Sequence, residues 1–427
     1  MKHSVNILIF PAGAENALEL YRSLRYAPRF RVFGASSVED HSAFVYEPES
    51  YIYGLPYIQS PDFLEAFNSV LHEHNIHMVF PTHDDVSLFL LENKESIDAL
   101  VVGSSVSTAL ICRDKRLLYN RFKNFSFCPI CFEQKDESIF PLFAKPARGQ
   151  GGQGCSIVNS DQEISAVLQD PAMLLCEYLP GNEYTVDCFT SKSGALLFAG
   201  MRSRDLVKMG ISFVSRSVPM TEECRLIAET LNSELEFRGL WFFQVKQDTH
   251  GRLKLLEVST RIAGTMGLYR QLGVNFAQLS AYDALNMDVS VLVQPLNVTL
   301  SRCLQNIYKL KIHYDVVYMD YDDTLVCNDK INILAIQFLY QCKNSSKKII
   351  LLTKHEGDLN ESLKNINLCR GLFDEIIHLA AHEAKVDKII YKNAILVDNL
   401  FSERKDAYEK KGIYVFDVDT LECLLDY

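Results

Sequence analysis

Two oxygen-bearing side chains in the middle of the chain are spaced for metal chemistry. Gln244 lies on one apolar segment and Glu257 on the next. The polar turn at 249–252 between them predicts a hairpin, which would present both side chains together to a hard cation such as Mg²⁺. Arg261 follows at a distance suited to a phosphate charge that develops during a reaction.

A glycine-rich segment earlier in the chain is suited to an anion. Lys145 is followed at 149–154 by four glycines in six positions, between two apolar segments. Glycine frees the backbone to aim several N–H groups at one phosphate, and Lys145 supplies a charge beside them. The segment is no P-loop, because neither a G-K-[ST] sequence nor a helix follows. The alternative is a mobile hairpin tip.

The segment 174–187 has the residues of an adenosine pocket. An apolar strand ends at Glu177, a Pro-Gly turn follows, and Glu183 precedes the next apolar run. Backbone groups of Glu177, Tyr178 and Leu179 would read the adenine edge, and the Glu183 carboxylate would accept the ribose hydroxyls. The alternative is an ordinary hairpin with exposed acidic residues.

A further group lies near the C-terminus, where Asp320 and Asp322 follow an apolar strand. Open α/β sheets build their sites at such carboxyl ends of strands. Thr353 and Asp398 each end a later apolar strand, and Lys385 precedes an amphipathic helix, so that all could face one crevice. A plain acidic loop is the alternative.

Three segments would have to position these groups in a multidomain protein of the α/β and α+β classes. Over 1–112, short apolar runs alternate with helix patterns, which predicts a parallel sheet of βαβ units. Over 113–300 the pattern is rich in β-hairpins, and over 312–427 the βαβ rhythm returns. The stretch 294–308 is the expected junction. In the first segment we expect strands at 7–10, 31–35, 77–80 and 99–102.

In this order the motifs of the first 300 residues resemble the ATP-grasp superfamily, and within it the carbamoyl-phosphate-synthetase-like branch. The segment 79–85 and the pair Asp114-Lys115 are part of the resemblance. It implies a Rossmann-like pre-ATP-grasp domain over 1–112 and an ATP-grasp domain over 113–300. The ATP-binding residues that it implies are Lys115, Lys145, Gly151, Gly152, Gly154, Glu177, Tyr178, Leu179 and Glu183.

The same resemblance implies a metal site and a chemistry. Gln244, Glu257 and Ser259 would hold Mg²⁺, with Mn²⁺ as an alternative, and Arg261 would steady an acyl-phosphate transition state. Ser259 stands where the family usually carries Asn. Because its hydroxyl reaches less far, we expect weaker binding of a second metal ion.

The C-terminal motifs, over 312–427, look like those of the haloacid-dehalogenase (HAD) superfamily. The resemblance implies a HAD-like Rossmannoid domain in which Asp320 is the nucleophile and Asp322 the general acid/base. Thr353 and Lys385 would bind the phosphoryl group, with Lys388 as the rival lysine.

A metal ion and a small cap are also implied for this domain. The implied Mg²⁺ ligands are Asp320, Asp322 and Asp398. Asn399 stands where many members carry another acid, which Glu403 could supply. Few residues separate the first motif from the strand before Thr353, so that we expect a minimal cap and an open site for a large or protein-borne phosphate.

Composition limits the classes of function. The 427 residues include 48% hydrophobic and 23% charged residues, and the formal net charge is -11. We therefore expect no nucleic-acid partner, since a non-specific nucleic-acid surface needs a basic stripe. The scattered cysteines and the isolated C-x-x-C at Cys128 and Cys131 favour a reducing cytoplasm over a disulfide framework or a zinc site. The apolar run 5–10 is too short for a signal sequence, and no run is long enough for a membrane span.

A dinucleotide fold is the tempting interpretation of the N-terminal segment, and two features oppose it. The first βα turn, at 11–16, lacks G-x-G-x-x-G. The second expected strand ends at Ala35 and two serines, with no carboxylate for a ribose. We therefore expect no nicotinamide cofactor.

The leading hypothesis is a bifunctional cytoplasmic enzyme. An ATP- and Mg²⁺-dependent carboxylate-amine ligase, acting through an acyl phosphate, would be joined to an aspartate-nucleophile phosphatase. The expected partners are a small-molecule carboxylate, an amine and a phosphomonoester, with no membrane partner, and a dimer is one option for the oligomeric state. Two alternatives remain: a synthetase that releases an acyl or carbamoyl phosphate, and a nucleotide-binding sensor or assembly protein with vestigial sites.

Two further groups of residues have an open role. His83, Asp84 and Asp85 could touch the acceptor substrate, or they could simply cap a helix. Lys208 and Arg216 could meet a carboxylate or a phosphate, or they could be solvated surface charges.

Overall fold

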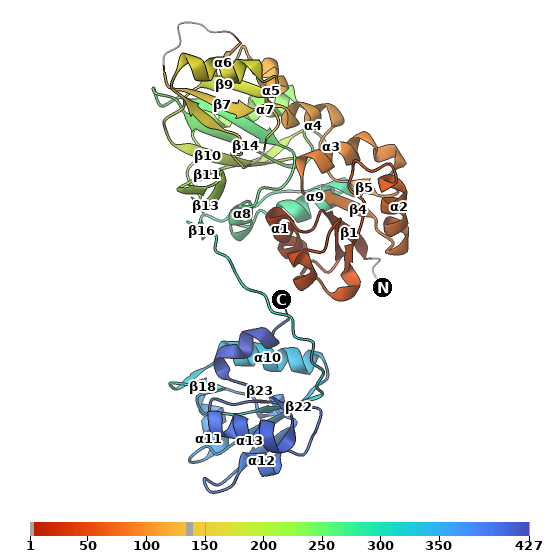
Figure 1. Cartoon of the computed structure of the whole chain (residues 1–427), viewed down its shortest axis with the longest axis vertical. Coiled ribbons are helices and arrows are strands. Elements are labelled where there is room, and N and C mark those ends of the chain that lie inside the picture. The colour runs from red at the N-terminus through yellow and green to blue at the C-terminus, as the bar shows by residue number, and fades with distance from the viewer. Residues whose placement is uncertain (1–3, 134–139, 150, 427) are drawn as a thin grey trace. The chain divides into compact units, whose positions relative to one another are not determined.

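A computed structural model describes residues 4–133, 140–149 and 151–426, and the chain divides into two compact units, Met1–Leu304 and Gln305–Tyr427 (Figure 1). The division falls inside the expected junction at 294–308. The further boundary expected at 112–113, within the first unit, stays a prediction. Each unit has its own sheets and its own buried core.

The first unit begins with a five-stranded parallel sheet in the order β3-β2-β1-β4-β5. All four strands expected in this segment are confirmed, with boundaries shifted by one or two residues. Ile7, Leu8 and Ile9 of β1 are fully buried, because helices cover both faces of a parallel sheet. The elements are β1 Val5–Phe10, α1 Glu15–Leu24, β2 Phe30–Ser36, β3 Tyr51–Tyr53, α2 Phe63–Glu73, β4 Met78–Pro81, α3 Asp84–Glu92, β5 Leu100–Val101 and α4 Val106–Arg113.

The rest of the first unit consists mainly of two four-stranded antiparallel sheets, in the orders β6-β9-β7-β8 and β11-β10-β14-β15, with a small sheet β12-β13-β16. Trp241 is fully buried, and its ring stacks on Phe237 with 3.8 Å between centroids. The hairpin-rich pattern expected here is confirmed.

The strands of these sheets are β6 Cys131–Phe132, β7 Leu142–Pro146, β8 Ser156–Val158, β9 Met173–Glu177, β10 Glu183–Thr190, β11 Leu196–Ser203, β12 Leu206–Lys208, β13 Ile211–Arg216, β14 Gly239–Gln247, β15 Leu253–Ser259 and β16 Thr299–Ser301. The helices are α5 Lys115–Phe122, α6 Asp161–Gln169, α7 Glu222–Glu234, α8 Gly267–Gln271 and α9 Phe276–Ala284. Figure 1 shows α6 beside β7 and β9, away from β10 and β14.

The second unit is one five-stranded parallel sheet in the order β21-β20-β17-β22-β23. In β17 (Val316–Met319), Val317 and Met319 pack on the side of α10 (Ile333–Asn344), whereas Val316 and Tyr318 pack on the side of α13 (Phe401–Lys411). Figure 1 shows the strands lying between these helices. The remaining elements are β18 Val326–Cys327, β19 Lys330–Ile331, β20 Lys348–Thr353, α11 Leu359–Asn365, β21 Glu375–His378, α12 Lys385–Lys388, β22 Ala394–Val397 and β23 Tyr414–Phe416.

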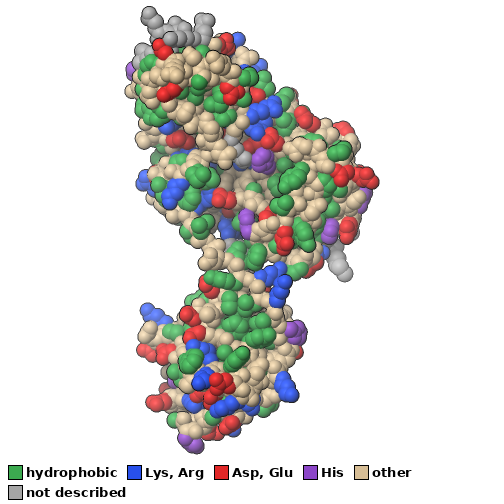
Figure 2. All heavy atoms as spheres, viewed as in Figure 1, with side chains coloured by type: hydrophobic (Ala, Val, Ile, Leu, Met, Phe, Trp, Pro, Cys, Tyr) green, Lys and Arg blue, Asp and Glu red, His purple; other side chains and the backbone are tan. Residues whose placement is uncertain are grey.

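The surface carries charges of both signs, and the described cysteines form no disulfide. On the face seen in Figure 2, acidic and basic side chains are interspersed, without a basic stripe. All twelve cysteines are free thiols, and the Sγ atoms of Cys131 and Cys176 lie 3.4 Å apart. Among the described residues, no helix is long and apolar enough to cross a membrane.

Candidate active sites

A cavity of about 230 Å³ lies between the two antiparallel sheets of the first unit. Its walls come from α5, from β7 and the glycine segment, and from β10, β14 and β15. Seven of the residues expected to bind ATP or metal line it: Lys115, Lys145, Gly151, Gly152, Glu183, Gln244 and Glu257. Gln150 of the glycine segment lies outside the described residues.

Helix α5 supplies Lys115 to the cavity wall and Tyr119 as a partner of Lys145. Lys115 is its first residue, behind the Asp114 cap, and Tyr119 follows one turn later on the same face. The buried Lys145 Nζ donates to the Tyr119 hydroxyl at 2.5 Å, and that hydroxyl donates to the Leu256 carbonyl at 2.6 Å. These contacts fix the ammonium of Lys145 at the cavity wall.

The predicted pairing of Gln244 and Glu257 is confirmed, since they are register partners in the β14–β15 hairpin. Two side chains at one register position project from the same face of a sheet. Lys115 Nζ lies 3.8 Å from Glu257 Oε2, so the Glu257 carboxylate pairs with the Lys115 ammonium. An amide and a carboxylate oxygen fit a hard cation, provided that phosphate and water complete its shell.

The glycine segment closes against a second loop. Gly151, Gly152 and Gly210 all have positive φ, and a Cβ on Gly210 would lie 2.3 Å from the Gly151 carbonyl carbon. Only glycine permits this approach of the segment to the β12–β13 turn. Gly154, expected to bind phosphate, packs toward Pro146 instead of lining the cavity.

Arg204 is a cavity residue that sequence reasoning missed. Its Nε lies 2.7 Å from Glu183, and its Nη2 donates to the Gly210 carbonyl at 2.8 Å. It thus joins the expected ribose-binding carboxylate to the loop that meets the glycine segment. The sequence could have pointed to Arg204, because Arg202 and Arg204 stand at alternate positions at the end of an otherwise apolar strand.

The expected adenine-binding residues lie outside the cavity lining. The Glu177 side chain accepts from the Ile130 N–H at 2.8 Å, and its own N–H donates to the Ile130 carbonyl. Leu179 is buried, and Tyr178 is half-buried. The Glu177 carboxylate therefore braces β6 and β9.

Ser259 and Arg261 both bind Asp84, the first residue of α3. Ser259 Oγ donates to Asp84 at 2.8 Å, and Arg261 Nη2 does so at 2.9 Å. Burial alone would raise the pKa of Asp84, but the Arg261 charge and the two hydrogen bonds outweigh it, so that this pKa lies below its ordinary value. Both side chains thereby tie β15 and its loop to the start of α3.

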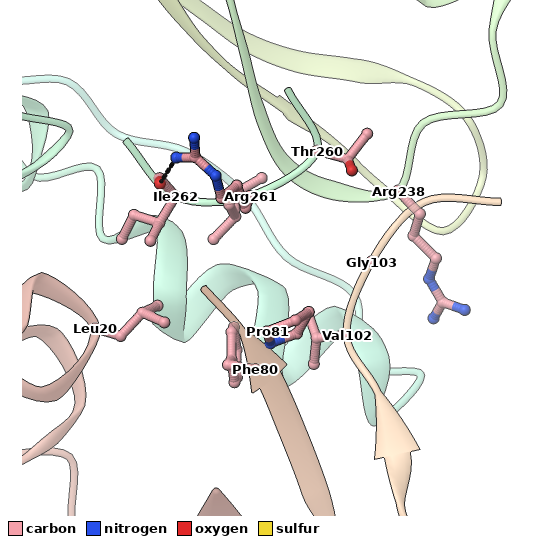
Figure 3. Close-up of a pocket in the computed structure, with 10 residues that line it drawn as sticks. Leu20, Phe80, Pro81, Val102, Gly103, Arg238, Thr260, Arg261 and Ile262 are labelled. Atoms are coloured by element: carbon pink, nitrogen blue, oxygen red, sulfur yellow. Dashed lines mark hydrogen bonds between the residues drawn. The ribbon is translucent and has the colours of Figure 1, made fainter. Parts of the chain in front are cut away.

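Figure 3 shows the surroundings of Arg261, whose Nη1 donates to the Ile262 carbonyl at 3.1 Å. Leu20, Phe80 and other side chains line a cavity of about 10 Å³ there. Such a volume admits at most a water molecule, so it is a packing gap.

The remaining candidates of the first unit have structural partners. His83 caps α3 by accepting from the Asp85 N–H at 3.3 Å, and Asp85 binds Arg113 through both carboxylate oxygens. Arg216 pairs with Asp205 at 2.7 Å, and Lys208 is exposed on β12.

The Asp40 carboxylate covers the first βα turn, where a dinucleotide fold would bind its pyrophosphate. The Asp40 carboxylate lies over Gly13, where an added Cβ would stand 2.1 Å from Asp40 Oδ2. Asp40 also accepts from the Ser42 N–H and the Tyr51 hydroxyl. A negative charge at this turn opposes a pyrophosphate.

In the second unit, a buried lysine joins two buried carboxylates. Asp320 follows β17 and Asp398 follows β22, which are neighbouring parallel strands. Lys385 Nζ, at the start of α12, lies 2.6 Å from Asp320 Oδ1 and 2.7 Å from Asp398 Oδ2. Lys388 is instead exposed, 3.6 Å from Glu383.

Burial is the largest single influence on the pKa of each group in this cluster. Together with the Asp398 charge, it raises the pKa of Asp320 to about 6. Burial also raises the pKa of Asp398. Although burial disfavours its charged form, the two carboxylates raise the pKa of Lys385. The cluster is thus an ion triad with one net negative charge when fully ionised.

The carboxylates of this cluster offer the hard oxygens that Mg²⁺ prefers, so the donor types fit the metal. Within the described residues, however, no group of three or more His, Cys, Asp or Glu side chains is arranged to hold a metal ion. Substrate oxygens and water would have to complete either expected metal site.

Four further residues that were expected near this site each have a partner: Thr353, Asp322, Asn399 and Glu403. Thr353 is fully buried, and its Oγ1 accepts from the His355 N–H at 3.1 Å. Asp322 is half-exposed and binds His355, a residue that sequence reasoning missed although it stands two places after Thr353. The Asn399 N–H donates to Thr324, and Glu403 pairs with Lys354.

Residues 169–305 match a family model described as "ATP-grasp in the biosynthetic pathway with Ter operon". The chain is also 25% identical over 232 residues to the vancomycin/teicoplanin A-type resistance protein VanA of Enterococcus faecium. That match covers 44% of this chain and 66% of the relative, so slightly less than two thirds of the relative is represented.

Solved structures share the fold at low identity. The N5-carboxyaminoimidazole synthetase of Staphylococcus aureus, complexed with ADP, has a TM-score of 0.58 at 12% identity, over 71% of this chain and 83% of its own. The biotin carboxylase domain of the Hydrogenobacter thermophilus 2-oxoglutarate carboxylase, with MgADP and bicarbonate, has 0.57 at 15%, over 69% and 72%. The L-amino acid ligase of Bacillus licheniformis has 0.52 at 18%, over 67% and 75%.

The chain is thus a mixed α/β, multidomain protein whose first unit shares the fold of these structures. The family model and the fold likeness together support an ATP-grasp domain in the first unit.

Proposed function

We propose that the first unit is an ATP- and Mg²⁺-dependent ligase that joins a carboxylate to an amine. The observation that supports this most is one cavity lined by Lys115, Lys145, Glu183, Gln244 and Glu257 under a glycine segment. The names of the relatives, among them an amino acid ligase and a synthetase, support the same reaction class.

The chemistry follows from charge. A carboxylate resists nucleophiles because of its negative charge, and transfer of a phosphoryl group from ATP turns it into an acyl phosphate that an amine can attack. Lys115 and Lys145 would neutralise phosphate charge, and Glu183 would hold the ribose. Mg²⁺, held by Gln244 and Glu257, supplies further charge neutralisation when bound. The glycine segment and the β12–β13 turn would exclude water.

ADP release with Mg·ATP, across a panel of amino acids and sugar acids with and without amines, tests this proposal. We expect amine-dependent ADP release that falls on the order of 100-fold in Glu257→Gln, by analogy with the loss of one charge-stabilising group. Glu234→Gln, an exposed change on α7, is the matched control. Unchanged turnover in Glu257→Gln would remove the metal assignment.

The same assay separates the alternatives. ADP release that needs no amine and leaves an acyl or carbamoyl phosphate would favour a synthetase. ATP binding without turnover on any substrate would favour a sensor with vestigial sites.

We propose that the second unit is an aspartate-nucleophile phosphatase. The supporting observation is the triad Asp320–Lys385–Asp398 at the carboxyl ends of neighbouring strands. Asp320 would attack the phosphorus, Asp322 would transfer the proton, and Thr353 and Lys385 would bind the phosphoryl oxygens. Mg²⁺, held by Asp320 and Asp398, would neutralise charge on the phosphate when bound.

Hydrolysis of p-nitrophenyl phosphate by the full chain with Mg²⁺ tests this second proposal. A phosphorylated Asp320 should be recoverable after rapid acid quenching. Wild-type protein that hydrolyses no phosphomonoester would contradict it.

A further inference from the structure

Three side chains beside the Asp320 triad form a continuous chain of hydrogen bonds. His355 Nδ1 lies 2.9 and 3.1 Å from the two oxygens of Asp322, and His355 Nε2 lies 2.8 Å from Ser362 Oγ. Asp322 follows β17, His355 follows β20, and Ser362 lies on α11. The chain therefore links the ends of two neighbouring strands to a helix.

The direction of these hydrogen bonds follows from the donors available. An ionised carboxylate only accepts, so His355 Nδ1 must carry the proton that is shared with Asp322. Nε2 of a neutral imidazole is then an acceptor, and the Ser362 hydroxyl donates to it. Asp322 therefore sets the tautomer, and the Ser362 hydroxyl complements it.

His355 is itself held on several sides. Its N–H donates to Thr353 Oγ1 at 3.1 Å, and its carbonyl accepts from His378 Nε2 at 2.7 Å. Its ring and that of Tyr321 form a T-shaped pair with 4.8 Å between centroids. The imidazole is thus a rigid support at the edge of the site.

Asp322 needs such a support. Its side chain is 53% exposed, whereas that of His355 is 16% exposed. A solvent-exposed aspartate samples several rotamers, and each unproductive rotamer removes the carboxyl from the reacting atoms. Because Nδ1 reaches both oxygens, one oxygen can accept from it while the other transfers a proton.

We infer that His355 and Ser362 are positioning residues for Asp322, the general acid/base of the proposed phosphatase. The inference rests on that proposed function. In the first step Asp320 Oδ bonds to phosphorus, the bond from phosphorus to the leaving oxygen breaks, and the Asp322 proton passes to that oxygen. In the second step water bonds to phosphorus, its proton passes to Asp322, and the bond to Asp320 breaks, releasing phosphate.

The role has a signature in the leaving group. Nitrophenolate is a weak base and departs without a proton, whereas an alkoxide needs one. Misplacing Asp322 should therefore slow the first step much more for alkyl phosphates than for p-nitrophenyl phosphate, whereas the second step is the same for both. A general loss of structure would slow both alike.

The test compares glycerol 2-phosphate with p-nitrophenyl phosphate in the full chain. His355→Ala should lower kcat/KM for the alkyl ester, which covers only the steps up to departure of the alcohol, on the order of 100-fold, the typical worth of general acid–base catalysis. It should change kcat/KM for the aryl ester little. His355→Asn keeps an N–H near the Nδ1 position and should recover most of the alkyl-ester rate. Ser362→Ala should have a smaller effect in the same direction.

His313→Ala is the matched control, because this exposed histidine precedes β17 at the opposite end of the sheet. An equal loss of kcat/KM on both esters in His355→Ala, or no rescue of the alkyl-ester kcat/KM by His355→Asn, would overturn the positioning role. A wild type inactive on both esters, or an Asp320→Asn variant as active as the wild type, would instead overturn the phosphatase itself.

Discussion

The two parallel sheets of this chain have the same topology and different strand ends. Numbered along the chain within each sheet, β3-β2-β1-β4-β5 and β21-β20-β17-β22-β23 both have the order 3-2-1-4-5. This order places a crevice at the carboxyl ends of the first and fourth strands, where open sheets bind ligands.

In the first sheet that crevice is filled by protein. Asn16 donates to the Thr82 and Ile262 carbonyls at 2.7 and 3.1 Å, and Asp40 covers Gly13. In the second sheet the same position carries Asp320 and the other members of its triad. The comparison teaches that topology supplies a position for a site, while the residues at the strand ends decide whether chemistry occurs there.

The strongest test of this difference is Asp320→Asn. We expect its kcat for p-nitrophenyl phosphate to fall on the order of 10³-fold or more, because an amide is no nucleophile. Asp84→Asn, at the equivalent edge of the first sheet, should leave this rate unchanged. An Asp320→Asn variant that keeps a tenth of the wild-type rate would break the comparison.

The next effect concerns stability. Lys385→Met leaves two buried carboxylates without their cation, which should lower the free energy of unfolding by about 3–5 kcal/mol in urea denaturation. Lys388→Met, an exposed neighbour on the same helix, should cost less than about 1 kcal/mol. Equal costs would show that the triad is no electrostatic unit.

The Asp84 contacts should matter less. Asp84→Ala removes the partner of Ser259 and Arg261, and we expect a loss of about 1–3 kcal/mol in the free energy of unfolding. The lowered pKa means that this stability is present above the ordinary carboxyl pKa and is lost as the pH falls through the folded-state value. Asp205→Ala, which breaks an exposed pair with Arg216, is the control.

A smaller, graded effect is expected from pH. In the proposed phosphatase Asp320 would attack as a carboxylate. Burial and the Asp398 charge raise its pKa to about 6, so that the protonated form prevails below that pH. The kcat/KM for p-nitrophenyl phosphate should therefore fall about tenfold per unit below pH 6. A rate that stays flat down to pH 4 would contradict the raised pKa.

Local sequence patterns predicted part of the fold and some of the site residues. Apolar runs of strand length predicted four strands of the first parallel sheet and the strands that end at Asp320, Thr353 and Asp398 in the second, because burial on both faces requires such runs. The short edge strands β3, β21 and β23 were not predicted. The turn between Gln244 and Glu257 predicted their pairing, since a hairpin sets its own register. Asp320 could be placed at a strand end because an apolar run stops at it.

Contacts between distant segments were decided only by the tertiary structure. Ser259, expected to face a metal ion, donates to Asp84 across 175 positions of sequence, and His355 meets Asp322 across 33. The choice between Lys385 and Lys388 beside Asp320 likewise depends on how α12 packs on the sheet. Periodicity reports which face of an element is buried, but the partner of a polar side chain depends on how whole elements pack, and no local spacing encodes that.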